Sequence, residues 1–90
     1  MKESKVIINN EEGLHARPAA MFVRAANQYL SDITILRDGE EVNGKSIIGI
    51  MSLGIFSGQE ITLQAEGSDE EKAIEGLVEF IENELSKEPA

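Results

Sequence analysis

Four stretches of this 90-residue chain carry the apolar pattern of β-strands. A β-branched run predicts the first strand. Alternation of apolar and polar side chains predicts the longer ones, because neighbouring side chains of a strand point to opposite faces. The predicted strands span residues 5–8, 32–37, 40–42 and 60–66. The Asp38-Gly39 pair predicts a hairpin that makes the short third strand an edge strand. Ile61, Leu63 and Ala65 are predicted to face the core.

Apolar residues at spacings of three and four predict a first helix from about residue 16 to residue 29. Its apolar face is predicted to be built mainly of small side chains, which let a helix lie close to a sheet: Ala16, Ala19, Ala20, Val23, Ala26 and Leu30. Arg17, Arg24 and Gln28 are predicted to point away from this face, and Met21 lies near the two arginines.

Two more helices are predicted further along the chain. The apolar run at residues 47–53 favours a short helix that Ser46 caps and Gly54 ends, although a buried strand has a similar pattern. Before the last helix, Ser68 and Glu71 have the spacing of a capping box. The apolar stripe of that helix is predicted to consist of Ile74, Leu77, Ile81 and Leu85.

The predicted order of elements is βαββαβα, which is typical of an α+β fold. The length predicts a single domain, which we place at residues 1–86, followed by a short polar tail at residues 87–90. Strands with alternating faces favour an antiparallel sheet that is covered by helices on one face and by water on the other.

Composition excludes several classes of function. The chain has no cysteine and one histidine, which argues against thiol catalysis, disulfides and a zinc site, so we expect no metal or other cofactor. The net charge of −9 argues against nucleic acid as a partner. Ten of the 17 acidic residues follow residue 59, so the segment around the histidine is nearly neutral. No membrane-spanning run or leader is evident, so we expect a soluble, intracellular protein.

The single histidine stands in the run Gly-Leu-His-Ala-Arg-Pro at residues 13–18, where the first helix is predicted to begin. Backbone N–H groups and the positive end of the helix dipole attract anions there, and Arg17 adds a charge suited to phosphate. Positive potential also favours the neutral, nucleophilic imidazole, so His15 is a candidate acceptor of a phosphoryl group. From the residue pattern alone, an exposed or helix-capping histidine is the alternative.

Two motifs together resemble the HPr family, the histidine-containing phosphocarriers of the bacterial phosphoenolpyruvate:sugar phosphotransferase system (PTS). They are the segment at residues 13–19 and the run Asn-Gly-Lys-Ser-Ile-Ile-Gly-Ile-Met-Ser-Leu-Gly at residues 43–54. The resemblance covers nearly the whole chain in length, element order and motif position. It implies an open-faced β-sandwich of a four-stranded antiparallel sheet and three helices.

The resemblance also implies a function. His15 matches the residue that enzyme I phosphorylates on Nδ1 with phosphoenolpyruvate, and Arg17 matches the arginine that steadies the phosphoryl group. The group then passes to the EIIA domains of sugar permeases. Such a protein is a cytoplasmic carrier and not an enzyme, and nothing in the sequence demands more than a monomer. The motif places no Asp or Glu beside His15 to activate water, which suits a carrier that must keep its phosphoryl group.

A second site is implied by the resemblance at Ser46. This residue matches the serine that HPr kinase/phosphorylase modifies in Gram-positive and some other bacteria, where the modified form binds a catabolite control protein. The residue pattern alone favours an ordinary helix cap.

The apolar residues of the short helix also have two interpretations. Pattern alone favours burial in the core. The resemblance instead implies an exposed apolar patch beside His15 that suits transient partners. The residues expected to contact partner proteins are Ala16, Ala20, Met21, Arg24, Ile47, Ile48 and Met51.

Several residues depart from a typical Gram-positive member. Gly44 stands where a larger residue is common, and Phe56 and Ser57 replace a small residue followed by lysine. Glu11 and Glu12 add negative charge near the candidate site. These departures leave the branch of the family open between the sugar pathway and the nitrogen-type regulatory pathway.

Other functions remain as alternatives to the carrier. A regulatory binding module would act through contacts controlled by Ser46, but such a protein could dispense with His15. An enzyme with a transient phosphohistidine would need a water-activating acid or a metal, and the sequence displays neither. An inert domain would not be expected to carry both motifs.

Overall fold

The computed structural model describes residues 1–85, so the expected boundary between the domain and its tail lies outside the described residues. Its elements follow the predicted βαββαβα order. They are β1 (Lys2–Ile7), α1 (Ala16–Ala26), β2 (Asp32–Arg37), β3 (Glu40–Asn43), α2 (Ile47–Leu53), β4 (Glu60–Glu66) and α3 (Glu70–Glu79), which continues as a π-helical turn, η1 (Phe80–Glu84).

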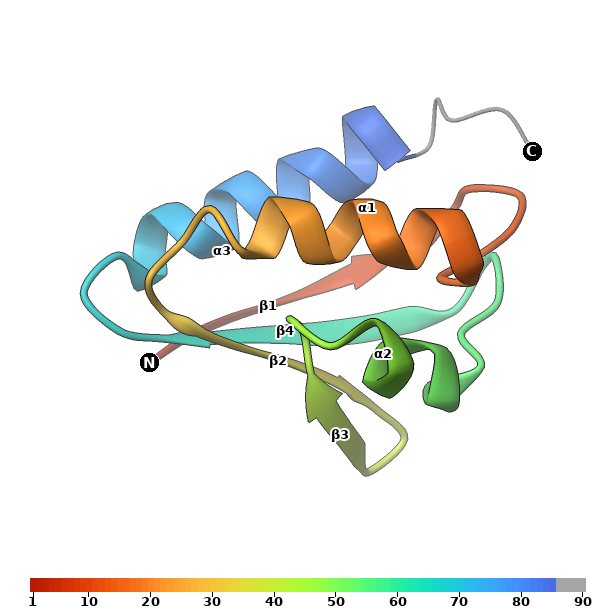
Figure 1. Ribbon diagram of the computed structural model, residues 1–90, viewed down its shortest axis with the longest axis horizontal. Helices are drawn as coiled ribbons and strands as arrows, with labels where there is room; N and C mark the ends of the chain where they lie inside the picture. The colour runs from red at the N-terminus through yellow and green to blue at the C-terminus, as the bar shows by residue number, and fades with distance from the viewer. Residues whose placement is uncertain (86–90) are drawn as a thin grey trace.

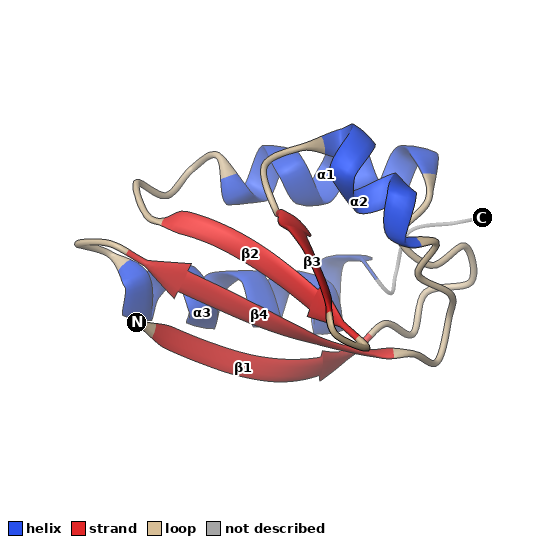
Figure 2. Cartoon of the chain, turned by 90° about the horizontal axis from the view of Figure 1, so that it is seen from below, coloured by secondary structure: helices blue, strands red, loops and turns tan. Residues whose placement is uncertain are grey.

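One antiparallel sheet holds the four strands in the order β1-β4-β2-β3. The helices cover one face of this sheet (Figures 1 and 2). Helix α3 packs against β1 and β4, helix α2 packs against β3, and α1 packs against both α2 and α3. On the other face of the sheet, side chains such as Thr62 and Gln64 stay partly exposed. The predicted open-faced sandwich is therefore confirmed.

The core lies between the sheet and the helices, and the strands supply a third of its buried apolar residues. Ile61, Leu63 and Ala65 of β4 are buried as predicted. Ile33 and Ile35 of β2 lie opposite Ala65 and Leu63 and are buried on the same side. Each large apolar side chain buried in this way contributes about 2 kcal/mol to folding.

Most predicted strand limits hold. Strands β2 and β4 have the predicted bounds, and β3 is one residue longer than predicted. Strand β1 begins at Lys2 and ends at Ile7, whereas residues 5–8 were predicted. The earlier start has a physical reason in pairing: Lys2 to Ile7 lie opposite successive residues of β4, so even its polar positions join the ladder.

Helix α1 ends at Ala26, before the predicted end at residue 29. Residues 27–30 form turns, and the Tyr29 carbonyl oxygen accepts a hydrogen bond at 2.8 Å from Lys45 Nζ, outside the helix. Leu30 was therefore wrongly placed on the apolar face, and it is 84% exposed. Ala16 was also wrongly placed there, because the first residue of the helix is exposed at its open end.

The buried face of α1 contains a side chain that the prediction omitted. Phe22 is fully buried, and the buried residues of the helix are Pro18, Ala19, Phe22 and Ala26. These residues recur at helical spacing. The prediction assumed an apolar face built mainly of small side chains and therefore omitted the aromatic ring of Phe22. The prediction that Arg17, Arg24 and Gln28 point away from the core is consistent with their exposure.

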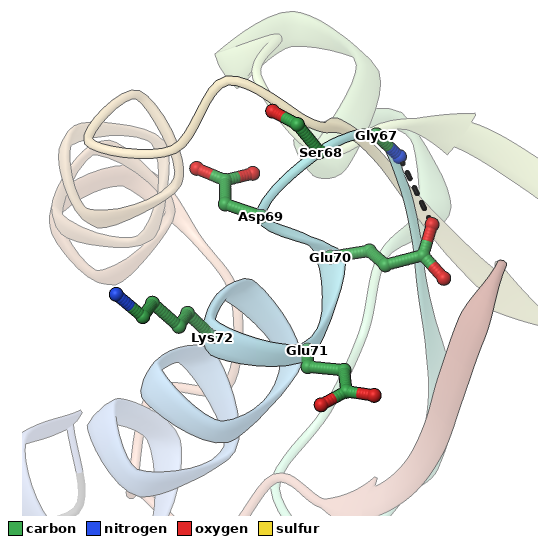
Figure 3. A pocket seen from close by; sticks show the side chains of 6 residues that line it. All are labelled: Gly67, Ser68, Asp69, Glu70, Glu71 and Lys72. Carbon is green, nitrogen blue, oxygen red and sulfur yellow. Dashed lines mark hydrogen bonds between the residues drawn. The ribbon is translucent and has the colours of Figure 1, made fainter.

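The capping box predicted at Ser68 was wrong. Ser68 is exposed, and the carboxylate that accepts a backbone N–H belongs to Glu70, whose Oε1 atom binds the Gly67 N–H at 3.1 Å (Figure 3). Helix α3 begins after Asp69, and this residue makes no capping bond. The apolar stripe was mostly right, because Leu77, Ile81 and Leu85 are buried while Ile74 is half-buried.

The Asp69 side chain is used for a long-range contact instead. Its carboxylate accepts the N–H groups of Leu30 and Ser31 at 2.8 and 3.0 Å, together with the Ser31 hydroxyl. These bonds join the segment before β2 to the start of α3. They also lower the pKa of Asp69, first through the Ser31 hydroxyl and then through the Leu30 N–H, because both stabilise the ionised carboxylate.

Candidate functional site

The loop before α1 is fixed by bonds between backbone atoms. Gly13 adopts a φ of 68°, in the left-handed region that favours glycine. Its N–H donates to the Asn10 carbonyl oxygen at 3.1 Å, and the Leu14 N–H donates to the Ile55 carbonyl oxygen at 3.1 Å. The buried Asn10 side chain donates back to the Gly13 carbonyl oxygen at 2.9 Å. Leu14 is buried, so the next residue is held at the surface.

That next residue is His15, which stands at the N-cap position of α1. Its backbone is extended, with φ −117° and ψ 164°, and its carbonyl oxygen accepts the Ala19 N–H at 3.0 Å. The imidazole is exposed and makes no capping hydrogen bond. The helix-capping alternative for the His15 side chain is therefore not supported, and the ring is accessible to a reacting group.

The surroundings of His15 suit an anion. First-turn N–H groups of a helix point toward its N-terminus, where His15 lies, and the helix dipole adds positive potential there. The exposed side chain of Arg17 stands one residue into the same helix. Pro18 occupies the first turn as predicted, where its missing N–H costs little.

A surface hollow borders His15, and we call it the His15 hollow. Its lining comes from the loop before α1, from α2 and from the loop after α2: Glu12, Leu14, His15, Met51, Gly54, Ile55 and Phe56. The exposed Glu12 brings an acidic residue to this hollow, although the motif placed none beside the histidine. The two sequence motifs thus meet at one place on the surface.

Helix α2 presents apolar side chains outward. Ile50 and Leu53 are buried, whereas Ile48 is 82% exposed, and Ile47 and Met51 are also exposed. We call the exposed residues Ile47, Ile48, Met51 and Phe56 the apolar patch. The core assignment for Ile47, Ile48 and Met51, favoured by pattern alone, was therefore wrong.

The remaining residues expected to contact partners lie on the neighbouring helix. Helix α1 packs against α2, and of its residues Ala16 and Arg24 are exposed while Ala20 and Met21 are half-buried. Sequence reasoning did not assign Phe56 to this surface. The available signal was a large apolar residue inside the short loop between Gly54 and Gly58.

Ser46 lies at the start of α2, where the helix prediction was right and the strand alternative wrong. Its Oγ atom accepts the Gly49 N–H at 3.0 Å, and Gly54 ends the helix in the left-handed conformation with φ 60°. The serine is half-buried. It is therefore a structural N-cap, and its hydroxyl lies on the same helix as most of the apolar patch.

A second hollow, at the N-terminus of α3, does not have the features of a reactive site. All its lining residues come from one continuous segment, residues 67–72 (Figure 3). Its carboxylates serve the fold: Asp69 binds the segment before β2, and Glu70 binds Gly67. The pKa of Glu70 is lowered, first by the Gly67 N–H and then by the N-terminal ammonium group.

Within residues 1–85, no group of three or more His, Asp or Glu side chains is arranged to hold a metal ion. Among the helices described, none combines the length and the apolar character needed to cross a membrane.

The chain matches a family model described as "PTS HPr component phosphorylation site" over residues 2–83. Two curated relatives of this chain are an HPr-like protein and a phosphocarrier protein. The HPr-like protein Crh of Halalkalibacterium halodurans is 54% identical over 93% of this chain and all of its own length. The phosphocarrier protein HPr of Buchnera aphidicola is 49% identical over 86% of this chain and 91% of its own.

Solved structures agree with the fold. The crystal structure of HPr-C-His from Thermoanaerobacter tengcongensis has a TM-score of 0.93 at 50% identity, covering 99% of this chain and all of that one. A crystal structure of Crh from Bacillus subtilis, with a TM-score of 0.75 at 46% identity, covers 93% of this chain and 97% of its own. That structure is a dimer with a swapped domain. The monomer expected from the sequence is therefore not supported by these relatives.

Proposed function

The chain belongs to the HPr family, and on this premise we propose that it carries a phosphoryl group on His15, accepted from enzyme I and passed to EIIA domains. HPr-family proteins are phosphocarriers rather than catalysts. The observation that carries the proposal is the exposed imidazole at the open end of α1, bordered by Arg17 and by the apolar patch. We place this activity in the cytoplasm, as the resemblance implies.

The transfer requires only the side chains of this surface. An imidazole nitrogen of His15, Nδ1 in this proposal, attacks phosphorus, and the bond between phosphorus and the donor breaks with its electron pair leaving on the donor. The N–H groups of the first turn and Arg17 stabilise the transferred charge. In the onward step the N–P bond breaks, and the acceptor takes the phosphoryl group.

The apolar patch supports docking of the two partners. Exposed apolar side chains around a reactive centre are typical of an interface core, and Met51 adapts easily to different partners. Arg17 and Arg24, exposed on α1, supply a polar rim. We include Ala16, Ala20 and Met21 in the contact surface because they belong to the helix that packs against α2.

Intact-mass spectrometry tests the carrier function. The wild type is mixed with a purified bacterial enzyme I and phosphoenolpyruvate, and His15→Ala is treated in parallel. We expect one acid-labile phosphoryl group on the wild type and none on the variant. A folded wild-type protein that gains no phosphoryl group from enzyme I of either PTS branch would refute the carrier function.

A regulatory role is the second candidate, and the Crh relatives favour it. Crh is described as an HPr-like protein, and the Bacillus subtilis structure concerns catabolite repression. In this role HPr kinase/phosphorylase modifies Ser46, and the product binds a catabolite control protein. Phosphorylation with ATP and this kinase, using Ser46→Ala as the control, tests it. The presence of His15 supports the carrier function in addition to this regulatory role.

A further inference from the structure

Strand β1 forms one edge of the sheet, because the strands lie in the order β1-β4-β2-β3. Just beyond β1, the Ile8 N–H donates toward β4, to the carbonyl oxygen of Gln59 at 2.9 Å. Since the backbone groups of successive residues point to opposite sides of an antiparallel strand, every second residue of β1 directs its N–H and C=O groups away from β4. These residues are Glu3, Lys5 and Ile7. The Lys5 carbonyl oxygen accepts a long hydrogen bond of 3.5 Å from Ser4 Oγ, which an incoming N–H can replace.

A groove follows this edge between β1 and α3, and Figures 1 and 2 show α3 running along β1. Two adjoining hollows form the groove, and both are lined by Ser4, Ile74 and Glu75. One of them extends along α3 to Val78 and Glu79. We call these two hollows together the edge groove. A strand placed beside β1 would therefore lie under side chains of α3.

The edge groove combines apolar side chains with an acidic rim. Ile74 and Val78 are half-buried and four residues apart on α3, whereas Glu75 and Glu79, which follow them, are exposed. Among the described residues that line the groove, five are glutamates and one is a lysine: Glu3, Glu71, Glu75, Glu79, Glu82 and Lys2. The lysine is already paired, because its Nζ atom lies 3.8 Å from Oε1 of Glu71. A complementary ligand is therefore basic and carries apolar stems.

We infer that the edge groove binds an extended segment of another protein, with Lys or Arg at alternate positions, as an added strand beside β1. The backbone of the segment pairs with the outward N–H and C=O groups of β1. Two residues of a strand span about 6.6 Å and four residues of a helix span about 6 Å, so alternate side chains match the spacing of Ile74 and Val78. The stems of Lys or Arg cover these two residues, and the charged ends reach Glu75 and Glu79.

A second copy of this chain does not fit the edge groove. The chain has a net charge of −9, and pairing β1 with β1 of a second copy would bring two acidic grooves together. Charged side chains on β1, such as Lys5, also oppose pairing between identical edges. A segment rich in Lys or Arg meets no such repulsion. The edge groove shares no lining residue with the His15 hollow, so this inference does not depend on the proposed function.

Fluorescence anisotropy tests the charge complementarity. The probe is a labelled short peptide of alternating lysine and threonine, at about 0.15 M salt to screen distant charges. Glu75→Gln combined with Glu79→Gln should raise Kd about fivefold, because each exposed ion pair contributes little. Glu60→Gln combined with Glu66→Gln is the matched control, since it removes two exposed charges from β4 outside the groove. Its Kd should equal that of the wild type, and circular dichroism verifies that both variants are folded.

Amide hydrogen exchange, followed residue by residue with NMR, tests the added strand. In the free protein, the N–H groups of Glu3, Lys5 and Ile7 should exchange rapidly, because they have no ladder partner. The alternating peptide should slow their exchange. A peptide with the same sequence but a methyl group on every backbone nitrogen keeps the charges and cannot pair as a strand. It should leave the three amides unprotected.

Every other outcome overturns the inference. It fails if the alternating peptide does not bind, or if both double variants weaken binding equally, which would indicate unspecific attraction to an acidic protein. It also fails if the peptide binds but protects amides elsewhere, around His15 for example, and leaves those of Glu3, Lys5 and Ile7 unprotected. If these three amides are protected in concentrated protein without peptide and lose that protection on dilution, a second copy occupies the edge instead.

Discussion

Replacing Gly13 by alanine should destabilise the protein more than the conformation of one residue explains. Alanine in the left-handed region costs about 1–2 kcal/mol relative to its preferred conformations. At Gly13 the added methyl group would also collide with the Ile55 carbonyl oxygen, and it would lie 3.0 Å from the Cα atom of Phe56. Relief of this collision requires the two loops to separate.

The cost of separation follows from the bond that it breaks. Losing the 3.1 Å hydrogen bond from Leu14 to Ile55 removes about 1 kcal/mol. Together with the conformational cost, Gly13→Ala should lower the free energy of unfolding by about 2–3 kcal/mol. In a domain of this size that corresponds to a fall in Tm of about 10–20 °C.

Gly54→Ala provides the matched control. Gly54 has a φ of 60°, close to the 68° of Gly13, but a methyl group there would meet no atom within 4 Å. It should therefore lose only the conformational term of about 1–2 kcal/mol. Urea denaturation followed by circular dichroism measures both variants. Equal losses in the two variants would refute the argument that contact between the loops sets the cost at Gly13.

The remaining predictions concern other parts of the fold. The bonds from Ser31 lower the pKa of Asp69 below its ordinary value of 3.8. Its stabilising effect should thus be complete above about pH 5 and disappear as the pH falls through the lowered pKa. In urea denaturation, Asp69→Asn should have a lower free energy of unfolding than the wild type at pH 7, and this difference should disappear below pH 3.8. A difference that does not change with pH would contradict the link between the pKa of Asp69 and stability. Ser46→Ala removes the N-cap bond of α2 and should cost about 1 kcal/mol in the same assay; no loss would mean that the cap is dispensable. Phe22→Ala should cost about 3–5 kcal/mol because it empties the core, whereas exposed Phe56→Ala should change stability by less than about 0.5 kcal/mol; similar losses would contradict the burial of one ring and the exposure of the other.

Local signals predicted those parts of the fold whose causes are themselves local. Strand β4 was predicted with its bounds because its alternation of apolar and polar side chains is complete within seven residues. The hairpin at Asp38-Gly39 depends on two adjacent residues with positive φ, 50° and 84°, so its sequence signal is equally short.

Predictions failed where distant residues decide the structure. In the turn after α1, the Tyr29 carbonyl oxygen accepts a hydrogen bond from Lys45 Nζ. The N–H groups of the next two residues donate to Asp69, which is 38 positions beyond Ser31. No periodicity within the helix contains that information. The same contact uses the carboxylate of Asp69, the N-cap residue of α3, which therefore makes no side-chain capping bond.

The candidate site shows a similar division. His15 was found from one motif because glycine, proline and a helix start are all encoded next to it. The proximity of His15 to Phe56 depends on the hydrogen bond between Leu14 and Ile55, which lie 41 positions apart. The sequence therefore identified the candidate nucleophile but not the aromatic ring that stands beside it.

The loops around His15 are joined mainly through backbone atoms, and this arrangement separates two demands on evolution. The bonds from Leu14 to Ile55, from Ile8 to Gln59 and from Gly58 to Ile8 use atoms that nearly every amino acid possesses. Exposed side chains on these loops are thus free to vary without displacing the imidazole. A protein of this design can exchange one set of partners for another by surface substitutions, while the geometry of its histidine is inherited unchanged.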